Sequence, residues 1–408
     1  MFGLERLRVI EVGTAVSIPL VGAVLANLGA EVLKVESRQR LDINRARVPR
    51  TAAPGSDPAA EAESFPLLHE LNPAKKSVTL NLKNPAGLEL FGRLLADSDV
   101  FIENYAPGWL ARLGLPWEDL LTRYPRLILL AASAYGEEGP LCQQRAYAPI
   151  MTRLAGLEGL IGYEDGATVG MMATALSDPN AAYFGLLAVF AALLDQQRSG
   201  LGCLIDLSQT EAAACLVGTA MAEYQLTGVE PGPRGNERPG REPHDFLPCA
   251  GEDSWVALSV GSDEQWRAVA DAAGPETGLA DPRFASAAGR REHRQAVQAA
   301  LAAWTRTRKA TEIAAALQGA GVACTPVLGV EEMESSPMLR ARKLTARVEH
   351  PLLGEMEVTA TPWHIDGEVP EPRGAGPVLA ADTRHVMSSV LGLDDEAFAA
   401  YQAQGAFD

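Results

Sequence analysis

The first part of the chain alternates short apolar stretches with stretches of helical periodicity. Residues 7–13 (LRVIEVG) and 30–36 (AEVLKVE) are rich in β-branched residues and predict buried strands, and residues 18–29 between them predict an apolar helix. The alternation continues with strands at 76–82, 100–105 and 126–133 and helices at 84–99 and 116–124. Strands that alternate with helices form a mainly parallel sheet through right-handed crossovers. We therefore predict an α/β fold with a Rossmann-like parallel sheet, in which 76–82 alternates like an exposed edge strand.

The pattern changes at two places. Residues 37–75 include Pro49–Arg50 and Pro54–Gly55 and predict a long surface excursion. Residues 227–245 are dense in glycine, proline and charge, which is typical of a linker or mobile loop. Beyond that loop we expect strands at 253–262, 324–333 and 339–365 and helices at 263–273, 291–318 and 394–404.

These changes divide the chain into three parts. We expect a large Rossmann-like domain at 1–225, a smaller α+β domain at 226–328, and a C-terminal segment at 329–408 that returns to the large domain.

Composition narrows the class of protein. Of 408 residues 47% are hydrophobic, which allows a sizeable core, and the formal net charge of −17 argues against a general nucleic-acid or membrane surface. The five cysteines form no CxxC pair, and cysteine and histidine show no zinc-ligand spacing, so we expect free thiols and no metal. The N-terminus lacks a signal-peptide pattern, and the apolar run at 181–194 is short for a membrane span. We therefore expect a soluble, cytoplasmic protein.

Asp178 is the most informative single residue. It lies in the segment 177–180 (SDPN), directly before the apolar run at 181–194. A carboxylate followed by proline and an apolar run predicts a helix N-cap with Pro179 at the first helical position. The helix N-terminus would hold this carboxylate ionised. Such a residue can be a cap only or an aimed nucleophile, and the spacing alone leaves both interpretations open.

The turn after the first strand does not match a dinucleotide-binding loop. Residues 13–19 (GTAVSIP) lack the G-x-G-x-x-G pattern that lets backbone approach a pyrophosphate. Glu36 ends the second strand, where a ribose-binding acid would stand. One acid without the glycines is weak evidence, so the sequence argues against NAD(P).

Several segments spread over nearly the whole chain carry a family resemblance. They are LRVIEVG…LANLGAEVLKVE (7–36), LNPAKKSVTLNLKNPAG (71–87), DVFIENYAPGWLARLGL (99–115), PRLILLAASAYGEEGP (125–140), RAYAPIM (145–151), ALSDPNAAYFGLLAVFAALLDQQRSGLG (175–202), IDLSQTEA (205–212) and GVACTPVLGVEEM (321–333). In this order they resemble the class III CoA-transferases, which include formyl-CoA:oxalate CoA-transferase, the carnitine CoA-transferase and the α-methylacyl-CoA racemases.

The resemblance implies a covalent mechanism. Asp178 stands at the position of the family's nucleophile and is expected to form a mixed anhydride with the donor acyl group and then an aspartyl-CoA thioester. The partners implied are an acyl-CoA, with succinyl-CoA as the default donor, and a carboxylic acid acceptor. No prosthetic group is implied, because coenzyme A enters as a thioester substrate.

The resemblance also implies a set of contacts to coenzyme A. Near the nucleotide and its phosphates it implies Arg38, Lys75, Asn104, Tyr105, Arg112 and Leu113. Beside the pantetheine arm and the acyl end it implies Ala15, Val16, Arg145 and Tyr147. Arg112 could pair with a phosphate through its planar guanidinium group. Each charged side chain could equally be a solvated surface charge, and the tyrosines could be aromatic residues at the edge of the core.

Two features depart from the family pattern. Ala148 stands where the family usually has a carboxylate after the tyrosine of the RAY segment, which leaves open a different acyl pocket, weaker catalysis or a subunit whose partner supplies the activity. The racemases place His and Asp where Tyr147 and Ala148 stand, so a racemase or epimerase would lack its acid/base pair. No glycine-rich flap is obvious, and residues 232–236 (GPRGN) could replace it or be an ordinary interdomain loop.

The family forms interlocked dimers, so the resemblance implies one here. We expect a homodimer. The alternative of a heteromer with a related subunit stays open, and in it this chain could be the non-catalytic partner.

Overall fold

The structure is a computed structural model that describes residues 3–46, 58–171 and 175–407. The chain divides into two compact units: the large unit comprises Met1–Leu157, Met171–Ala222 and Arg340–Asp408, and the small unit comprises Glu158–Gly170 and Glu223–Leu339. These limits differ from the expected ones at 225 and 328, because residues 158–170 group with the small unit and the C-terminal return begins at 340. Part of the excursion at 37–75, from 47 to 57, lies outside the described residues. The rest is not the expected surface segment, because Arg45, Leu68 and Asn72 are buried.

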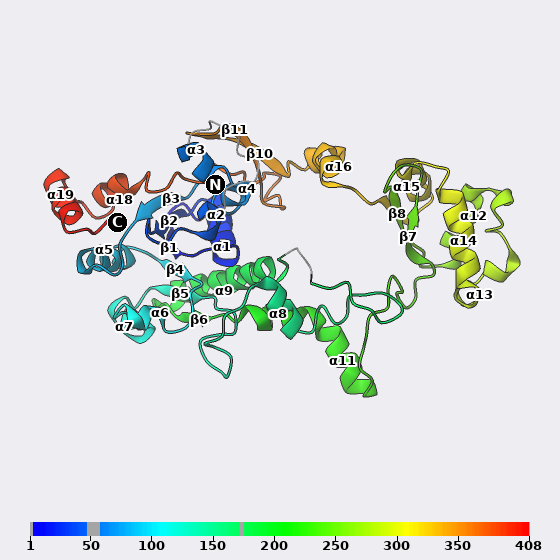
Figure 1. The fold of residues 1–408 in the computed structure, drawn as a ribbon, viewed down its shortest axis with the longest axis horizontal. Coiled ribbons are helices and arrows are strands. Elements are labelled where there is room, and N and C mark those ends of the chain that lie inside the picture. The colour runs from blue at the N-terminus through cyan, green and yellow to red at the C-terminus, as the bar shows by residue number, and fades with distance from the viewer. Residues whose placement is uncertain (1–2, 47–57, 172–174, 408) are drawn as a thin grey trace. The chain divides into compact units, whose positions relative to one another are not determined.

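The large unit is built on a six-stranded sheet with the order β3-β2-β1-β4-β5-β6, in which every neighbouring pair is parallel (Figure 1). The strands are β1 (Arg8–Val12), β2 (Glu31–Glu36), β3 (Lys76–Thr79), β4 (Val100–Glu103), β5 (Ile128–Ala131) and β6 (Leu204–Asp206). The chain first builds outward from β1 to β3 and then crosses to the other side of β1 to build β4 to β6. The carboxyl ends of β1 and β4 therefore form the switch point at which doubly wound sheets bind ligands.

Helices cover both faces of this sheet because alternate strand residues point to opposite sides. Val9, Val100 and Ile128 pack in one core cluster with α1 (Ser17–Asn27) and α9 (Ser177–Ser199). The next residues along each strand, Ile10, Phe101 and Leu129, pack in a second cluster with α5 (Pro85–Ala96) and α18 (Thr383–Ser389). Partly buried residues of α19 (Asp395–Ala403) pack against this cluster. Both faces are thus buried, as the nearly continuous apolar strands predict. The predicted parallel α/β sheet is confirmed.

The edge strand β3 is not exposed, contrary to the prediction from its alternation. The C-terminal part of the chain supplies acceptors to its free edge: Asp382 accepts from the Ser77 N–H at 2.9 Å, and the Thr383 hydroxyl accepts from the Thr79 N–H at 3.0 Å. Ser77, Val78 and Thr79 are all buried. These contacts satisfy backbone groups that would otherwise offer a pairing edge to another chain.

Helix α9 is longer than the apolar run at 181–194 that predicts it. By length and composition α9 could cross a membrane, and among the described helices it is the only one of which this is true. The expectation that this segment is short for a membrane span therefore does not hold for the whole helix. Ala182, Leu186 and Val189 pack in the core beneath the sheet. We therefore regard α9 as a core helix, although its opposite face is exposed.

The small unit has a core of its own, formed around residues such as Trp266 and Leu301. Its antiparallel sheet has the order β7-β8-β9, with strands β7 (His244–Pro248), β8 (Trp255–Ser259) and β9 (Ala323–Pro326). The single helix predicted at 291–318 is two helices, α14 (Arg294–Thr305) and α15 (Ala310–Gly319). The polar segment 306–309 separates them, because it offers no apolar side chain with which to continue the buried stripe.

The remaining elements complete the two units. In the large unit they are α2 (Ile43–Ala46), α3 (Pro58–Glu63), α4 (Pro66–Leu71), α5 (Pro85–Ala96), α6 (Trp109–Arg112), α7 (Trp117–Arg123), α8 (Ala148–Leu154), α10 (Gln209–Ala214), the 3-10 turn Cys215–Val217, the hairpin β10 (Thr345–His350) and β11 (Gly354–Thr359), α18 (Thr383–Ser389) and α19 (Asp395–Ala403). In the small unit they are α12 (Asp263–Ala273), the 3-10 turns Pro275–Thr277 and Pro282–Phe284, α13 (Ala287–Glu292) and α16 (Val330–Ser335). The limits of the units fall within α11 (Gly218–Thr227) and α17 (Pro337–Ala341).

Candidate active site

Two adjoining cavities lie at the carboxyl ends of the central strands of the large unit. The strand-end cavity, of about 530 Å³, is lined by residues that follow β1, β2 and β4. The Asp178 cavity, of about 330 Å³, is lined by residues that follow β1, β4 and β5 and by Asp178 of α9. The two cavities share wall residues, among them Ala15, Arg40, Tyr105 and Tyr147. An elongated ligand could therefore occupy both.

The turn between β1 and α1 separates the two cavities and is fixed by side chains from other strands. The Asn104 amide after β4 accepts from the Thr14 N–H at 3.0 Å and donates to the Thr14 carbonyl at 2.8 Å. Ala15 has a left-handed backbone with φ of 64°, and its N–H donates to Asp42 at 3.3 Å. The backbone of this turn is thus held in place before any ligand arrives.

A fully buried cluster of charges lies beneath this turn. The Lys34 ammonium contacts Glu11 at 2.9 Å and Asp42 at 3.1 Å, and it donates to the Gly13 carbonyl at 2.9 Å. Lys75 contacts the other oxygen of Glu11 at 2.7 Å. Burial disfavours the charge on Lys34, but the surrounding carboxylates outweigh it and raise its pKa. For Lys75, burial prevails and lowers the pKa to about 8. We call these four side chains the buried charge cluster.

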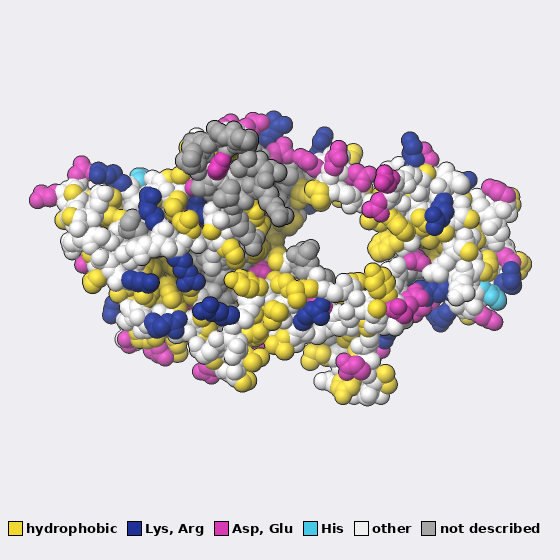
Figure 2. All heavy atoms as spheres, viewed as in Figure 1, with side chains coloured by type: hydrophobic (Ala, Val, Ile, Leu, Met, Phe, Trp, Pro, Cys, Tyr) yellow, Lys and Arg dark blue, Asp and Glu magenta, His cyan; other side chains and the backbone are white. Residues whose placement is uncertain are grey.

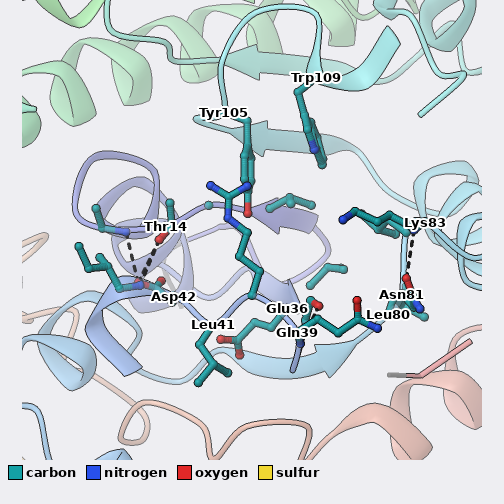
Figure 3. A pocket seen from close by; sticks show the side chains of 18 of the residues that line it. Thr14, Glu36, Gln39, Leu41, Asp42, Leu80, Asn81, Lys83, Tyr105 and Trp109 are labelled. Atoms are coloured by element: carbon teal, nitrogen blue, oxygen red, sulfur yellow. Dashed lines mark hydrogen bonds between the residues drawn. The ribbon is translucent and has the colours of Figure 1, made fainter. Parts of the chain in front are cut away.

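Aromatic and basic side chains form the wall of the strand-end cavity. Tyr105 and Trp109 stack with ring centroids 4.7 Å apart and 16° between planes, and the Arg40 guanidinium lies 5.3 Å from the centre of the Tyr105 ring. Tyr105 and Trp109 reach into the cavity from one side, and Gln39 lies opposite them (Figure 3). A planar ring with attached anionic groups would suit such a wall.

Asp178 lies in the first turn of α9 and not at its N-cap. The helix begins at Ser177, whose hydroxyl donates to the Ala148 carbonyl at 3.4 Å, and Leu176 precedes it. Burial raises the pKa of Asp178 to about 6, and a hydrogen bond from its own backbone N–H lowers it by less. Desolvation therefore outweighs the helix N-terminus, contrary to the sequence-based expectation. The carboxylate is still about nine-tenths ionised at neutral pH.

Asp178 is the one carboxylate among the described residues that line its cavity. Arg112 and Arg145 line the same cavity, and both are largely exposed. Tyr147 is 70% exposed at the N-cap of α8, and Ala148 after it is buried and lies outside both cavity walls. The wall of the cavity therefore contains one poorly solvated carboxylate and, elsewhere, exposed cationic side chains.

The model of CoA-transferase family III matches residues 4–383. This chain belongs to CoA-transferase family III. It is 31% identical over 408 residues to a succinyl-CoA–D-citramalate CoA-transferase of Chloroflexus aurantiacus, covering 98% of this chain and 97% of that one. A succinyl-CoA–L-malate CoA-transferase beta subunit of the same organism is 27% identical over 96% of this chain and 95% of its own length. A solved CaiB/BaiF family protein from Brucella suis superposes with a TM-score of 0.84 at 27% identity, covering 95% and 99% of the two chains.

The structure of this family III CoA-transferase brings most of the predicted site residues together. Those that line one or both cavities are Ala15, Asn104, Tyr105, Arg112, Leu113, Arg145, Tyr147 and Asp178. Arg38, Lys75 and Val16 lie outside both cavities.

The contacts of Lys75 explain why it lies away from the cavities. The Lys75 ammonium donates to the Pro19 carbonyl at 2.7 Å and to Asn72 at 2.9 Å and pairs with Glu11, which leaves it no proton for a phosphate. Arg38 is exposed outside the cavity walls, whereas Arg40, two residues later, lines both cavities. Val16 is the residue that precedes α1.

The acid at the end of the second strand is engaged in contacts within the protein. Glu36, which stands where a ribose-binding acid would, pairs with the Arg45 guanidinium at 2.7 Å and accepts from the Ser77 hydroxyl at 2.6 Å. Its oxygens are committed to the fold, which agrees with the missing glycines.

Sequence reasoning missed several residues of the Asp178 cavity, among them Ser133 and Gln209. Ser133 follows β5 and Gln209 begins α10 after β6, so both stand just beyond the carboxyl ends of strands. That position is the signal by which they could have been found.

Proposed function

We propose that this enzyme moves CoA from an acyl-CoA donor, with succinyl-CoA as the first candidate, to a carboxylic acid through covalent intermediates on Asp178. The observation that carries the proposal is a poorly solvated carboxylate alone in a cavity that adjoins an aromatic and basic cavity large enough for a nucleotide. The donors named in the two Chloroflexus relatives support the choice of succinyl-CoA.

The chemistry follows from one oxygen of Asp178. It attacks the thioester carbonyl and expels the CoA thiolate, which leaves a mixed anhydride on the protein. The thiolate then attacks the aspartyl carbonyl, releasing the donor acid and leaving aspartyl-CoA. The acceptor acid repeats both steps in reverse and leaves as its CoA thioester. Burial suits this sequence, because it makes the carboxylate a stronger nucleophile and limits hydrolysis of the anhydride.

The walls suggest how coenzyme A lies. The adenine ring would stack in the strand-end cavity near Tyr105 and Trp109, with its phosphates near Arg40. The pantetheine arm would pass Ala15 and Tyr147, which belong to both cavities, and bring the thioester to Asp178.

An acyl-CoA racemase would need an acid and a base on opposite sides of one carbon. Among the described residues of the Asp178 cavity there is no histidine and no second carboxylate. The arrangement therefore favours CoA transfer over racemisation.

We also propose that the enzyme works as a dimer. The exposed face of α9 carries large apolar side chains, including Tyr183, Phe184, Leu187 and Leu194, and Figure 2 shows hydrophobic side chains on the surface over this helix. An apolar face of this kind is typical of a subunit interface. Light scattering on the purified chain, alone and mixed with any co-encoded relative, would distinguish a homodimer from a heteromer.

The proposed nucleophile can be tested by trapping. Wild-type protein quenched during turnover of succinyl-CoA with an acceptor acid should carry CoA or an acyl group on the peptide that contains Asp178, and hydroxylamine should convert the same residue to a hydroxamate. The Asp178→Asn variant should show neither adduct. Asp195→Asn, an exposed carboxylate on the same helix, is the matched control and should behave like the wild type. Full exchange by Asp178→Asn would refute the assignment, and exchange only in the presence of a second subunit would make this chain the non-catalytic partner.

A further inference from the structure

Two polar side chains in the Asp178 cavity are buried without hydrogen-bond partners. Gln209 is 6% exposed and Ser133 is 5% exposed, and both line the cavity. The Gln209 Oε1 and Ser133 Oγ atoms have no hydrogen-bond partner among the described residues. Buried polar atoms in folded proteins are almost always hydrogen-bonded, so an exception in a cavity points to a missing ligand or water.

The orientation of the Gln209 amide decides which partner is missing. Its nitrogen donates to the Ala132 carbonyl at 2.9 Å, and turning the amide over would place two oxygens against each other. The free atom is therefore the oxygen, which can only accept. An ionised carboxylate or a thioester carbonyl brings no donor, so a simple carboxylic acid would leave this oxygen unsatisfied.

The backbone around the two residues is held rigidly. The Gln209 N–H donates to the Ser133 carbonyl at 3.1 Å, and the Thr210 N–H donates to the Ala134 carbonyl at 3.1 Å. The Ser208 side chain caps α10 by accepting from the Glu211 N–H at 3.2 Å. Side chains on such a support are positioned before the ligand binds, which is what selective recognition requires.

We propose that Gln209 and Ser133 select acids that carry a hydroxyl group. The acid's O–H would donate to Gln209 Oε1, and its oxygen would accept from the Ser133 hydroxyl, while its carboxylate meets the Asp178 intermediate. A site built to hydrogen-bond a substrate hydroxyl discriminates strongly against the analogue that lacks it, because its polar groups then stay unpaired. The proposal rests on the proposed function, since it names the class of acceptor acid for the same site.

The other possible donor is an amide N–H of the pantetheine arm. A donor on coenzyme A would be present with every acid and would give no preference among them. The acid preference and the affinity for coenzyme A therefore separate the two sources.

Equilibrium binding tests the proposal without turnover. Acids with and without a hydroxyl group are titrated calorimetrically into the enzyme saturated with CoA. Succinate is compared with each enantiomer of malate, and glutarate with each enantiomer of 2-hydroxyglutarate. We expect at least one hydroxy acid to bind about tenfold or more tightly than the matched acid without the hydroxyl group. Gln209→Met should abolish that preference and leave the affinity for CoA unchanged. Gln143→Met, an exposed glutamine outside both cavities, is the matched control.

Two results would overturn the proposal. Equal affinities of the matched acids for the wild type would mean that water alone occupies the site. Weaker CoA binding by Gln209→Met, with no change in acid preference, would assign Gln209 to the pantetheine arm. If Gln209→Met does not fold, Ser133→Ala should reduce the same preference. The binding experiment measures no exchange, so its outcome is independent of the trapping experiment. A preference for hydroxy acids without adducts on Asp178 would refute only the proposed mechanism. Adducts on Asp178 without the preference would refute only the proposed role of Gln209 and Ser133.

Discussion

The buried charge cluster and Asp178 are two solutions to the same problem, a charged group removed from water. In the cluster each charge has an opposite partner, and the coulombic effect of Lys34 keeps the pKa of Asp42 low despite burial. No ion pair joins Asp178 to a cationic side chain among the described residues, and burial raises its pKa to about 6. Paired charges hold the turn between β1 and α1 in place, whereas an unpaired carboxylate keeps the reactivity that the proposed covalent mechanism needs.

Removing the unpaired charge should give the largest effect on activity. We expect Asp178→Asn to lower CoA exchange by about a thousandfold or more, because no other described carboxylate lines the cavity. Chemical denaturation should show a folded protein that is no less stable than the wild type. A variant that loses both activity and stability would indicate a structural role like that of the cluster.

Removing a carboxylate from the cluster should mainly affect stability. Glu11→Gln leaves Lys34 and Lys75 buried without their shared partner, and we expect a loss of about 3–5 kcal/mol in the free energy of unfolding. Urea denaturation measures it. If the folded fraction of this variant keeps a normal rate of exchange per active site, the cluster supports the fold and not the chemistry.

The raised pKa of Asp178 should appear in stability as a function of pH. A carboxyl group whose pKa is higher in the folded state binds more protons there, so its contribution to stability is greatest below the unfolded pKa near 4 and is lost as pH rises through about 6. Above that pH, Asp178→Asn should be about 1–2 kcal/mol more stable than the wild type, after allowance for partial solvent exposure. Equal pH profiles for the two proteins would show that the carboxyl is not desolvated.

The same group should set the acid limb of the rate. The exchange rate kcat/KM should fall about tenfold per pH unit below about pH 6 and level off above it, because only the ionised carboxylate attacks. A plateau that extends down to pH 4 would argue against an elevated pKa in the working enzyme.

The smallest effect is expected from a partly exposed charge. Glu31 pairs with Arg8 at 2.7 Å, and its side chain is 27% exposed. Glu31→Gln should lower the free energy of unfolding, measured by urea denaturation, by less than about 1 kcal/mol. This partly exposed ion pair is the comparison for the buried one that Glu11→Gln removes.

The strands were predictable because β-branched runs buried on both faces have few other interpretations. The place of Asp178 at the start of an apolar helix was also predictable, whereas its proposed role as the nucleophile came from the family resemblance and stays a prediction. The burial of Lys75 was not, because a lysine's surroundings depend on which strands and helices meet around it. One signal was visible: Glu11 and Lys34 lie inside two apolar strands, and they are opposite each other in the register of β1 and β2. Ser133 and Gln209 stand beyond strand ends, which is a signal in the sequence, but only the sheet order shows that these strand ends meet at one site.

The cover over β3 has a consequence for how the protein is made. The backbone groups of a strand completed by residue 79 find their acceptors only at Asp382 and Thr383, some three hundred residues later. During synthesis that edge stays open until residues 382 and 383 have left the ribosome, so the N-terminal half cannot reach its final state alone. We expect chains shortened before residue 380 to aggregate rather than fold, which makes the segment that covers β3 a requirement for soluble expression.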